Sequence, residues 1–206
     1  MAFLFMSFAI VERLTSKKQV FFIFFSTYVR YTVSIMLQLS NALSNQSVLS
    51  LRTGTPVAML FEPIINPNNL KIEGFYCQDS ISKQTLVLLP QDIRDILPQG
   101  FVVNDHDVLV EPADLVRLKS VLDLGFELLG KPVVTSSGEK LGKVNDYSTE
   151  TTSMVIQKLY VSQSIFKNFS GGNLGIDRSQ ITEITDKKIV VQDTSVKITQ
   201  GAQATA

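Results

Sequence analysis

The residues best suited to acid–base chemistry stand together in one short segment. Asn104, Asp105, His106 and Asp107 place the chain's single histidine between two carboxylates. Such a histidine can be oriented as a general base or can ligate a metal. We interpret the segment as a turn instead, because Asn and Asp favour turns and no second histidine is present to complete a site. We therefore predict neither a catalytic residue nor a metal site, and we do not expect an enzyme.

The single cysteine, Cys77, could act as a nucleophile only with a lowered pKa and a nearby base. Its place in an apolar strand position indicates a small core residue. One cysteine can form neither an intramolecular disulfide nor a four-cysteine zinc site. The cysteine count thus favours a reducing, cytoplasmic location.

A glycine-rich segment at residues 170–175 could cradle an anion with its backbone amides. It has neither the dinucleotide fingerprint nor the Lys-Ser/Thr of a P-loop, so we interpret it as a loop and predict no cofactor and no small-molecule substrate. Phe166, Phe169, Gly171 and Gly172 are candidate partner-binding residues, with core burial of the two phenylalanines as the alternative.

Composition excludes several classes of protein. The 206 residues are 45% hydrophobic and 18% charged, with 19 basic and 19 acidic side chains, which excludes collagen-like, disordered and supercharged chains. Residues 1–35 hold four basic residues and one acidic residue, so the remainder is mildly acidic. Binding to phosphates needs clustered Lys and Arg, so nucleic acid is not expected as the main direct ligand.

Residues 1–35 are apolar and basic and hold seven of the 13 phenylalanines. Their uncharged window, Gln19 to Val29, is too short to span a bilayer, and no suitable signal-peptide cleavage site follows it. The segment is either an anchor at the membrane interface, which would make the protein membrane-associated, or an upstream stretch before translation begins at Met36. We favour the second interpretation, because the repeat described next has no counterpart of residues 1–35.

The chain aligns with itself after a shift of 84 residues. The shift matches Gly54 with Gly138, Ile72 with Ile156 and Tyr76 with Tyr160, and after four extra residues Ile93 matches Ile181 and Asp105 matches Asp193. Apolar positions, turn glycines and acidic positions recur in order over about 65 residues. We predict two similar modules, residues 36–110 and 126–193, followed by a disordered tail at 194–206.

Short alternating apolar runs within each module predict antiparallel strands rather than helices. In the second copy the expected strands are 132–135, 141–147, 153–161, 172–176 and 188–192. Gly54 and Gly138 are predicted structural turn residues with positive φ. A one-residue slip in the apolar pattern predicts a β-bulge near Gly74 and another near Lys158. The Asn-rich run from Ile64 to Asn69 predicts a long hairpin loop.

Residues 111–125 are predicted to form a helix that joins the modules. Pro112 can occupy the first helical turn. One face would carry apolar residues, while Arg117 and Lys119 point outward. The apolar residues of this face are Leu115, Leu118, Val121 and Leu122.

Several segments together resemble the PRC-barrel family, which includes the cytoplasmic domain of the photosynthetic reaction-centre H subunit and the C-terminal domain of the ribosome-maturation factor RimM. They are Leu129-Gly130-Lys131-Pro132-Val133, Lys140-Leu141-Gly142-Lys143-Val144, Ile181–Ile184 and Ile189–Val191. The resemblance covers residues 43–193, although the first copy has Thr55-Pro56-Val57-Ala58 where the second has the Lys-Leu-Gly stretch. It implies a mainly β fold of two tandem small antiparallel β-barrels joined by a short helix, without catalytic residues.

The resulting expectation is a non-catalytic binding or adaptor protein that holds a protein partner on a barrel face or in the groove between the barrels. One alternative is an RNA-processing or ribosome-associated factor in the manner of RimM. Another is a membrane-proximal assembly factor, which would require residues 1–35. The sequence names neither the partner, nor the oligomeric state, nor the barrel that binds.

Overall fold

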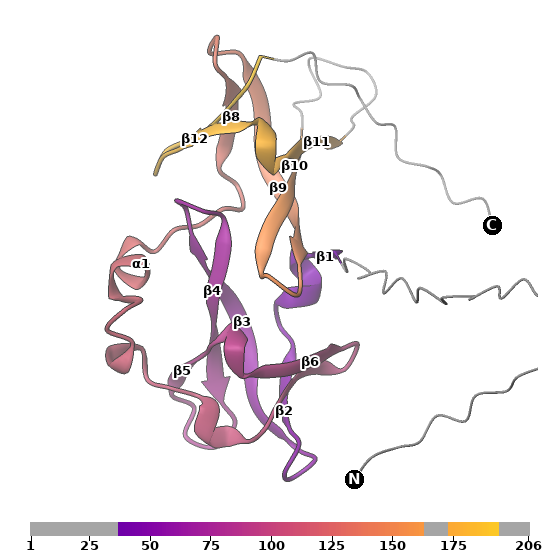
Figure 1. Ribbon diagram of the computed structural model, residues 1–206, viewed down its shortest axis with the longest axis vertical. Coiled ribbons are helices and arrows are strands. Elements are labelled where there is room, and N and C mark those ends of the chain that lie inside the picture. Colours follow the sequence, from indigo (N-terminus) through magenta and orange to yellow (C-terminus); the bar gives the residue numbers. More distant parts are fainter. Residues whose placement is uncertain (1–36, 163–172, 194–206) are drawn as a thin grey trace, which may run out of the picture. The chain divides into compact units, whose positions relative to one another are not determined.

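The computed structural model describes residues 37–162 and 173–193. Within these ranges the fold is mainly β, as expected, with 13 strands in one sheet and one short α-helix (Figure 1). The predicted N-terminal segment and C-terminal tail lie outside the described residues.

The strands fall into two groups separated by the α-helix. The first group is β1 (Leu37–Leu39), β2 (Ser47–Ser50), β3 (Pro56–Asn66), β4 (Lys71–Asp79), β5 (Thr85–Leu88), β6 (Ile93–Leu97) and β7 (Gly100–Val103). The second group is β8 (Pro132–Thr135), β9 (Lys140–Glu150), β10 (Val155–Ser162), β11 (Asn173–Asp177), β12 (Ile181–Ile184) and β13 (Ile189–Val191). The helical elements are α1 (Lys119–Leu124) and the 3-10 turns η1 (Ser40–Leu43), η2 (Pro90–Asp92), η3 (His106–Val108), η4 (Pro112–Asp114) and η5 (Arg178–Gln180).

The strands follow one another in a single path, β12-β13-β8-β9-β10-β4-β3-β2-β7-β6, with β1 on β9, β11 on β10 and β5 on β4. Most neighbours are antiparallel, but β2 pairs with β7 and β8 with β13 in parallel. Within the described ranges the end strands β12 and β6 do not pair with each other, so the sheet is not closed.

The two halves of the sheet have the same order of elements. Four strands, a 3-10 turn and two more strands follow one another from β2 to β7 and again from β8 to β13. The β3–β4 pairing skips Glu73 and the β9–β10 pairing skips Gln157, so the predicted bulges near Gly74 and Lys158 are confirmed. Three further irregularities also fall on positions that the sequence alignment matched: Val57 with Leu141, Phe61 with Asn145, and Arg94 with Thr182.

The halves join where β4 lies antiparallel to β10. Lys71 pairs with Val155, and these two residues are matched by the 84-residue shift. The N–H of Ile72 donates to the carbonyl of Met154 at 2.8 Å, and the N–H of Ile156 donates to that of Leu70 at 2.9 Å. Reciprocal bonds between matched positions are the pattern of an isologous, two-fold contact.

Each half is also contacted by the segment that precedes the other half. Strand β1, before the first half, pairs with β9, and the N–H and Oγ of Ser40 donate to Asp146 Oδ1 at 3.1 and 2.6 Å. Helix α1, before the second half, lies beside β3. These crossed contacts tie the halves into one unit.

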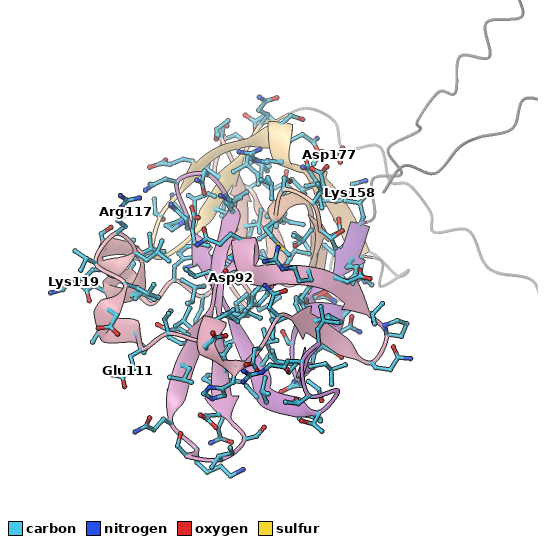
Figure 2. The ribbon with its side chains drawn as sticks, turned by 60° about the horizontal axis from the view of Figure 1, so that its bottom comes forward. Asp92, Glu111, Arg117, Lys119, Lys158 and Asp177 are labelled. Atoms are coloured by element: carbon cyan, nitrogen blue, oxygen red, sulfur yellow. The ribbon has the colours of Figure 1, made fainter. Side chains whose placement is uncertain are left out.

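The linking helix is shorter than the predicted 111–125. Pro112 opens the separate turn η4, and α1 begins only at Lys119. It ends at Leu124 and is capped by Gly125, whose φ of 49° is left-handed. The predicted difference in burial is present, although part of this stretch lies outside α1. The four apolar residues are half-buried, while Arg117 and Lys119 are exposed and point outward in Figure 2. In the described ranges, no helix is long and apolar enough to cross a membrane.

One continuous core holds apolar residues from both halves, among them the fully buried Ile72, Phe75, Ile156 and Leu159. The predicted loop at Ile64 to Asn69 is wrong in its first half. Ile64 and Ile65 are buried residues of β3, and the turn begins only at Pro67. The prediction of a loop relied on the proline and asparagine content of the segment. Ile64 and Ile65 remain in the strand because their side chains are buried.

Candidate functional site

His106 does not form a site with the acidic residues beside it. It begins η3, directly after β7, and its Nε2 lies 2.8 Å from Asp79 Oδ2 at the end of β4. The neighbouring Asp105 accepts from Ser50 Oγ instead and pairs with Arg52. In residues 37–162 and 173–193, no group of three or more His, Cys, Asp or Glu side chains could hold a metal.

Asp79 is the carboxylate most affected by this contact. Hydrogen bonds lower the pKa of Asp79 from 3.8 to about 2. The largest cause is the Ile81 N–H, which donates to Asp79 Oδ1 at 2.6 Å, and the second is the bond to His106. The sequence did not indicate this pair, because the two residues are 27 positions apart. The arrangement closes the β4–β5 turn against η3, and we assign it a structural role.

The lowered pKa makes a prediction for acid stability. A carboxylate with a depressed folded-state pKa stabilises the fold fully above its ordinary pKa and loses that contribution as pH falls through the folded value. We expect Asp79→Asn to be less stable than the wild type above pH 3.8, and the difference to shrink as pH falls to about 2. Urea unfolding of both proteins across this range measures the difference, and a difference independent of pH would contradict the assignment.

The two turn glycines have the conformation that their positions require. Gly54 and Gly138 have φ values of 68° and 88°. Next to each turn, an aspartate that follows the last strand of that half accepts a hydrogen bond from a serine. Asp105 accepts from Ser50 Oγ at 3.1 Å, and Asp193 accepts from the N–H and Oγ of Ser137 at 3.1 and 2.9 Å. These bonds lower the pKa of Asp193, for which the Ser137 N–H is the largest cause.

Cys77 is a core residue, as predicted. Its side chain is fully buried in β4, opposite Leu60 and Leu86. Burial raises the pKa of its thiol to about 12. A thiol with this pKa is not a nucleophile at neutral pH.

The candidate partner-binding residues Phe166, Phe169, Gly171 and Gly172 lie outside the described residues. The strands on either side are in place, since Ser162 of β10 pairs with Asn173 of β11. Residues 173–175 of the glycine-rich segment belong to β11, with Leu174 buried, so this part is strand rather than an anion-binding loop.

A large groove, with a volume of about 740 Å³, lies where the two halves meet. One wall is the turn between β3 and β4, Pro67 to Leu70, and the other is η5 with all of β12. In Figure 1 the β3–β4 turn is directed towards β12. We call this the large groove; its lining residues are Pro67, Asn68, Asn69, Leu70, Gln157, Asp177, Arg178, Ser179, Ile181, Thr182, Glu183 and Ile184.

Most charged groups of the large groove are already engaged. Arg178 Nη2 donates to the carbonyl of Asn69 at 2.9 Å and so joins the two walls. Lys158 Nζ lies 3.3 Å from Asp177 Oδ1, and Figure 2 shows the two side chains next to each other. Glu183 is exposed, and no ion pair joins it to another residue of the described ranges. A binding partner would therefore meet one available carboxylate.

A small groove of about 320 Å³ occupies the matching place, again between the two halves. Its walls are the β9–β10 turn, with Thr151, Thr152 and Met154, and the β6 residues Ile93 to Ile96. Gln38 of β1 also lines it, whereas no residue of α1 lines the large groove. The groove that β1 lines is therefore the smaller of the two.

The sequence indicated a groove between modules only in general terms. It did not indicate which residues form it, because the two walls come from segments more than 100 positions apart. A signal was available in the repeat, since Pro90–Ile96 and Arg178–Ile184 are matched and line one wall of each groove.

A scan against protein-family models finds no match to this chain, and a search of curated proteins finds no similar sequence. The functional argument therefore depends on the geometry and the residues themselves.

Proposed function

We propose that this protein is a non-catalytic binding or adaptor protein of PRC-barrel type, cytoplasmic, which holds a protein partner in the large groove. The observation that carries the proposal is the groove itself. It is wide and surface-accessible, it lies between two halves of matched architecture, and it combines apolar residues such as Leu70 and Ile184 with polar ones.

Two tandem small barrels are part of this proposal. The repeated order of elements, the four pairs of matched bulges and the reciprocal bonds at the β4–β10 junction support two equivalent modules. Bulges bend strands and are a common means of curving a small sheet towards closure. The resemblance of residues 43–193 to the PRC-barrel family agrees with this arrangement.

Binding is favoured over catalysis by the chemistry of the groove. Among its lining residues, Asp177 and Arg178 are engaged with neighbours, and the histidine and the cysteine both lie elsewhere. A nucleophile beside an oriented base, which covalent catalysis needs, is not among the lining residues. A protein surface is the class of ligand that such a mixed, exposed lining fits.

The test compares capture by proteins that differ only in which groove is blocked. Full-length protein, tagged at its C-terminus, is used to pull down proteins and RNA from native lysate at low and high salt. Ser179→Trp fills the large groove, and Thr152→Trp is the matched control in the small groove; both residues are exposed. We expect a salt-resistant protein partner to be retained by the wild type and Thr152→Trp, and to be at least about tenfold depleted with Ser179→Trp.

Other outcomes distinguish the alternatives. Ribosomal proteins or RNA that fade with salt in all three proteins would favour the ribosome-associated factor. Equal capture of one partner by all three proteins would place binding outside the large groove. Capture that requires residues 1–35 would favour the membrane-proximal factor.

A further inference from the structure

We propose that the large groove binds its partner as an added β-strand, with an extended peptide pairing along the free edge of β12. This inference rests on the proposed function and specifies the class of partner: an extended segment with one apolar face and a basic residue on the other. The reasons, all drawn from the described residues, are an edge of β12 without strand pairing, the way the groove is lined, and the charge of Glu183.

The edge of β12 that faces the groove is available for pairing. β12 ends the strand path, and all its pairing is with β13 on one side. In the described ranges, the N–H of Ile181 donates to the carbonyl of Arg178, and no other backbone hydrogen bond reaches Ile181 to Ile184 from the groove side. A strand edge of this kind presents unpaired N–H and C=O groups and is a template for strand addition.

The lining shows that the groove runs along this edge. Successive side chains of a strand point to opposite faces, so a pocket over one face contacts alternate residues. The large groove is lined by four consecutive residues, Ile181 to Ile184. Four residues span about 13 Å, enough to pair with a short extended peptide.

The side chains define what such a peptide should carry. Ile181 and Ile184 pair with the buried Val191 and Ile189, so both lie on the core side of β12, and Leu70 lies in the opposite wall. One face of the incoming strand should therefore be apolar. Glu183, exposed and without an ion pair in the described ranges, favours a lysine or arginine on the other face.

The chain offers a matched pair of positions for the test. Thr182 is skipped in the β12–β13 pairing and Arg94 in the β6–β7 pairing, and the alignment matches the two. Proline is tolerated at bulges on edge strands, and it removes an N–H. Thr182→Pro should distort β12 and so disrupt its edge in the large groove, while Arg94→Pro makes the same change beside the small groove.

The probe is a phage-displayed library of short linear peptides, selected on the full-length wild type and resynthesised with a fluorophore. We expect peptides with alternating apolar residues and a basic residue. We expect these peptides to bind Thr182→Pro at least about tenfold more weakly than the wild type, and Arg94→Pro equally well. Bound peptide should slow amide exchange at Ile181–Ile184 and leave Ile93–Ile96 unchanged.

Circular dichroism and thermal melting check that both variants fold. If Thr182→Pro does not fold, Glu183→Arg takes its place and should weaken the basic peptides by a similar factor. Two results would overturn the proposal. The selected peptides could bind the wild type and the edge variant equally well, or the selection could enrich no peptide for the wild type over the variant.

Two other occupants would also overturn it. Self-association of the wild type that Thr182→Pro abolishes would identify a second copy on the edge. Slow exchange at β12 without peptide, lost on deletion of residues 194–206, would identify the chain's own end. If the partner captured from lysate is lost with Ser179→Trp but kept with Thr182→Pro, strand addition fails while the adaptor function stands.

Discussion

Replacement of Phe75 by alanine should lower the free energy of unfolding by about 3–5 kcal/mol, which is a large share of the stability of a typical domain. Phe75 is fully buried, and its ring packs at 58° to that of Phe101, with 5.2 Å between the centroids. The substitution removes a large apolar side chain, leaves a cavity, and abolishes an aromatic pair that joins β4 to β7. Urea unfolding followed by circular dichroism measures the loss.

Phe61→Ala is the matched control. Phe61 also belongs to an aromatic pair, stacked on Tyr76 at 6.0 Å, but its residue remains 42% exposed. We expect a loss of about 1 kcal/mol or less, because little apolar surface returns to water. Equal losses for the two variants would contradict the core described here.

Gly142→Ala should be nearly as damaging, by about 2–4 kcal/mol, although it adds a single methyl group. Gly142 has a φ of 149°, and a Cβ built on it would overlap the carbonyl oxygen of Ser162 in β10. The clash is with backbone rather than with a flexible side chain, so β9 and β10 would have to separate. The same unfolding measurement gives the cost.

Gly138→Ala measures the cost of the left-handed backbone conformation without a steric clash. Gly138 has a φ of 88°, but open space surrounds the position of its missing Cβ. Only the left-handed conformation is then unfavourable, and we expect a loss of about 1 kcal/mol. A loss for Gly142→Ala no greater than that for Gly138→Ala would mean that the strands adjust to the methyl group.

The sequence predicted much of the local structure, because local structure is encoded in short-range patterns. The alternation around Ile72 and Cys77 indicated strands. Its one-residue slip predicted bulges near Gly74 and Lys158, one residue from their observed positions. The turn at Gly138 was also predictable, since its conformation suits glycine. The prediction was wrong where composition and burial disagree, as at Ile64 and Ile65, which lie within β3.

The candidate site was much less predictable. The segment around His106 was interpreted as a turn. Its partner Asp79 was not predicted, because contact between distant residues leaves no local pattern in the sequence. The aromatic residues Phe166 and Phe169 drew attention through composition alone. The large groove consists mainly of ordinary polar and aliphatic residues, which no motif distinguishes.

The sequence by itself determined the class of fold, the turns and the bulges, because each depends on residue type and on spacing within a few positions. Tertiary structure decided that β4 joins β10, that β1 pairs with β9, and that β12 ends the strand path of the described residues beside the β3–β4 turn. These arrangements depend on burying matched apolar surfaces and satisfying backbone groups across segments distant in the chain, and those requirements are met only when the whole sheet is assembled.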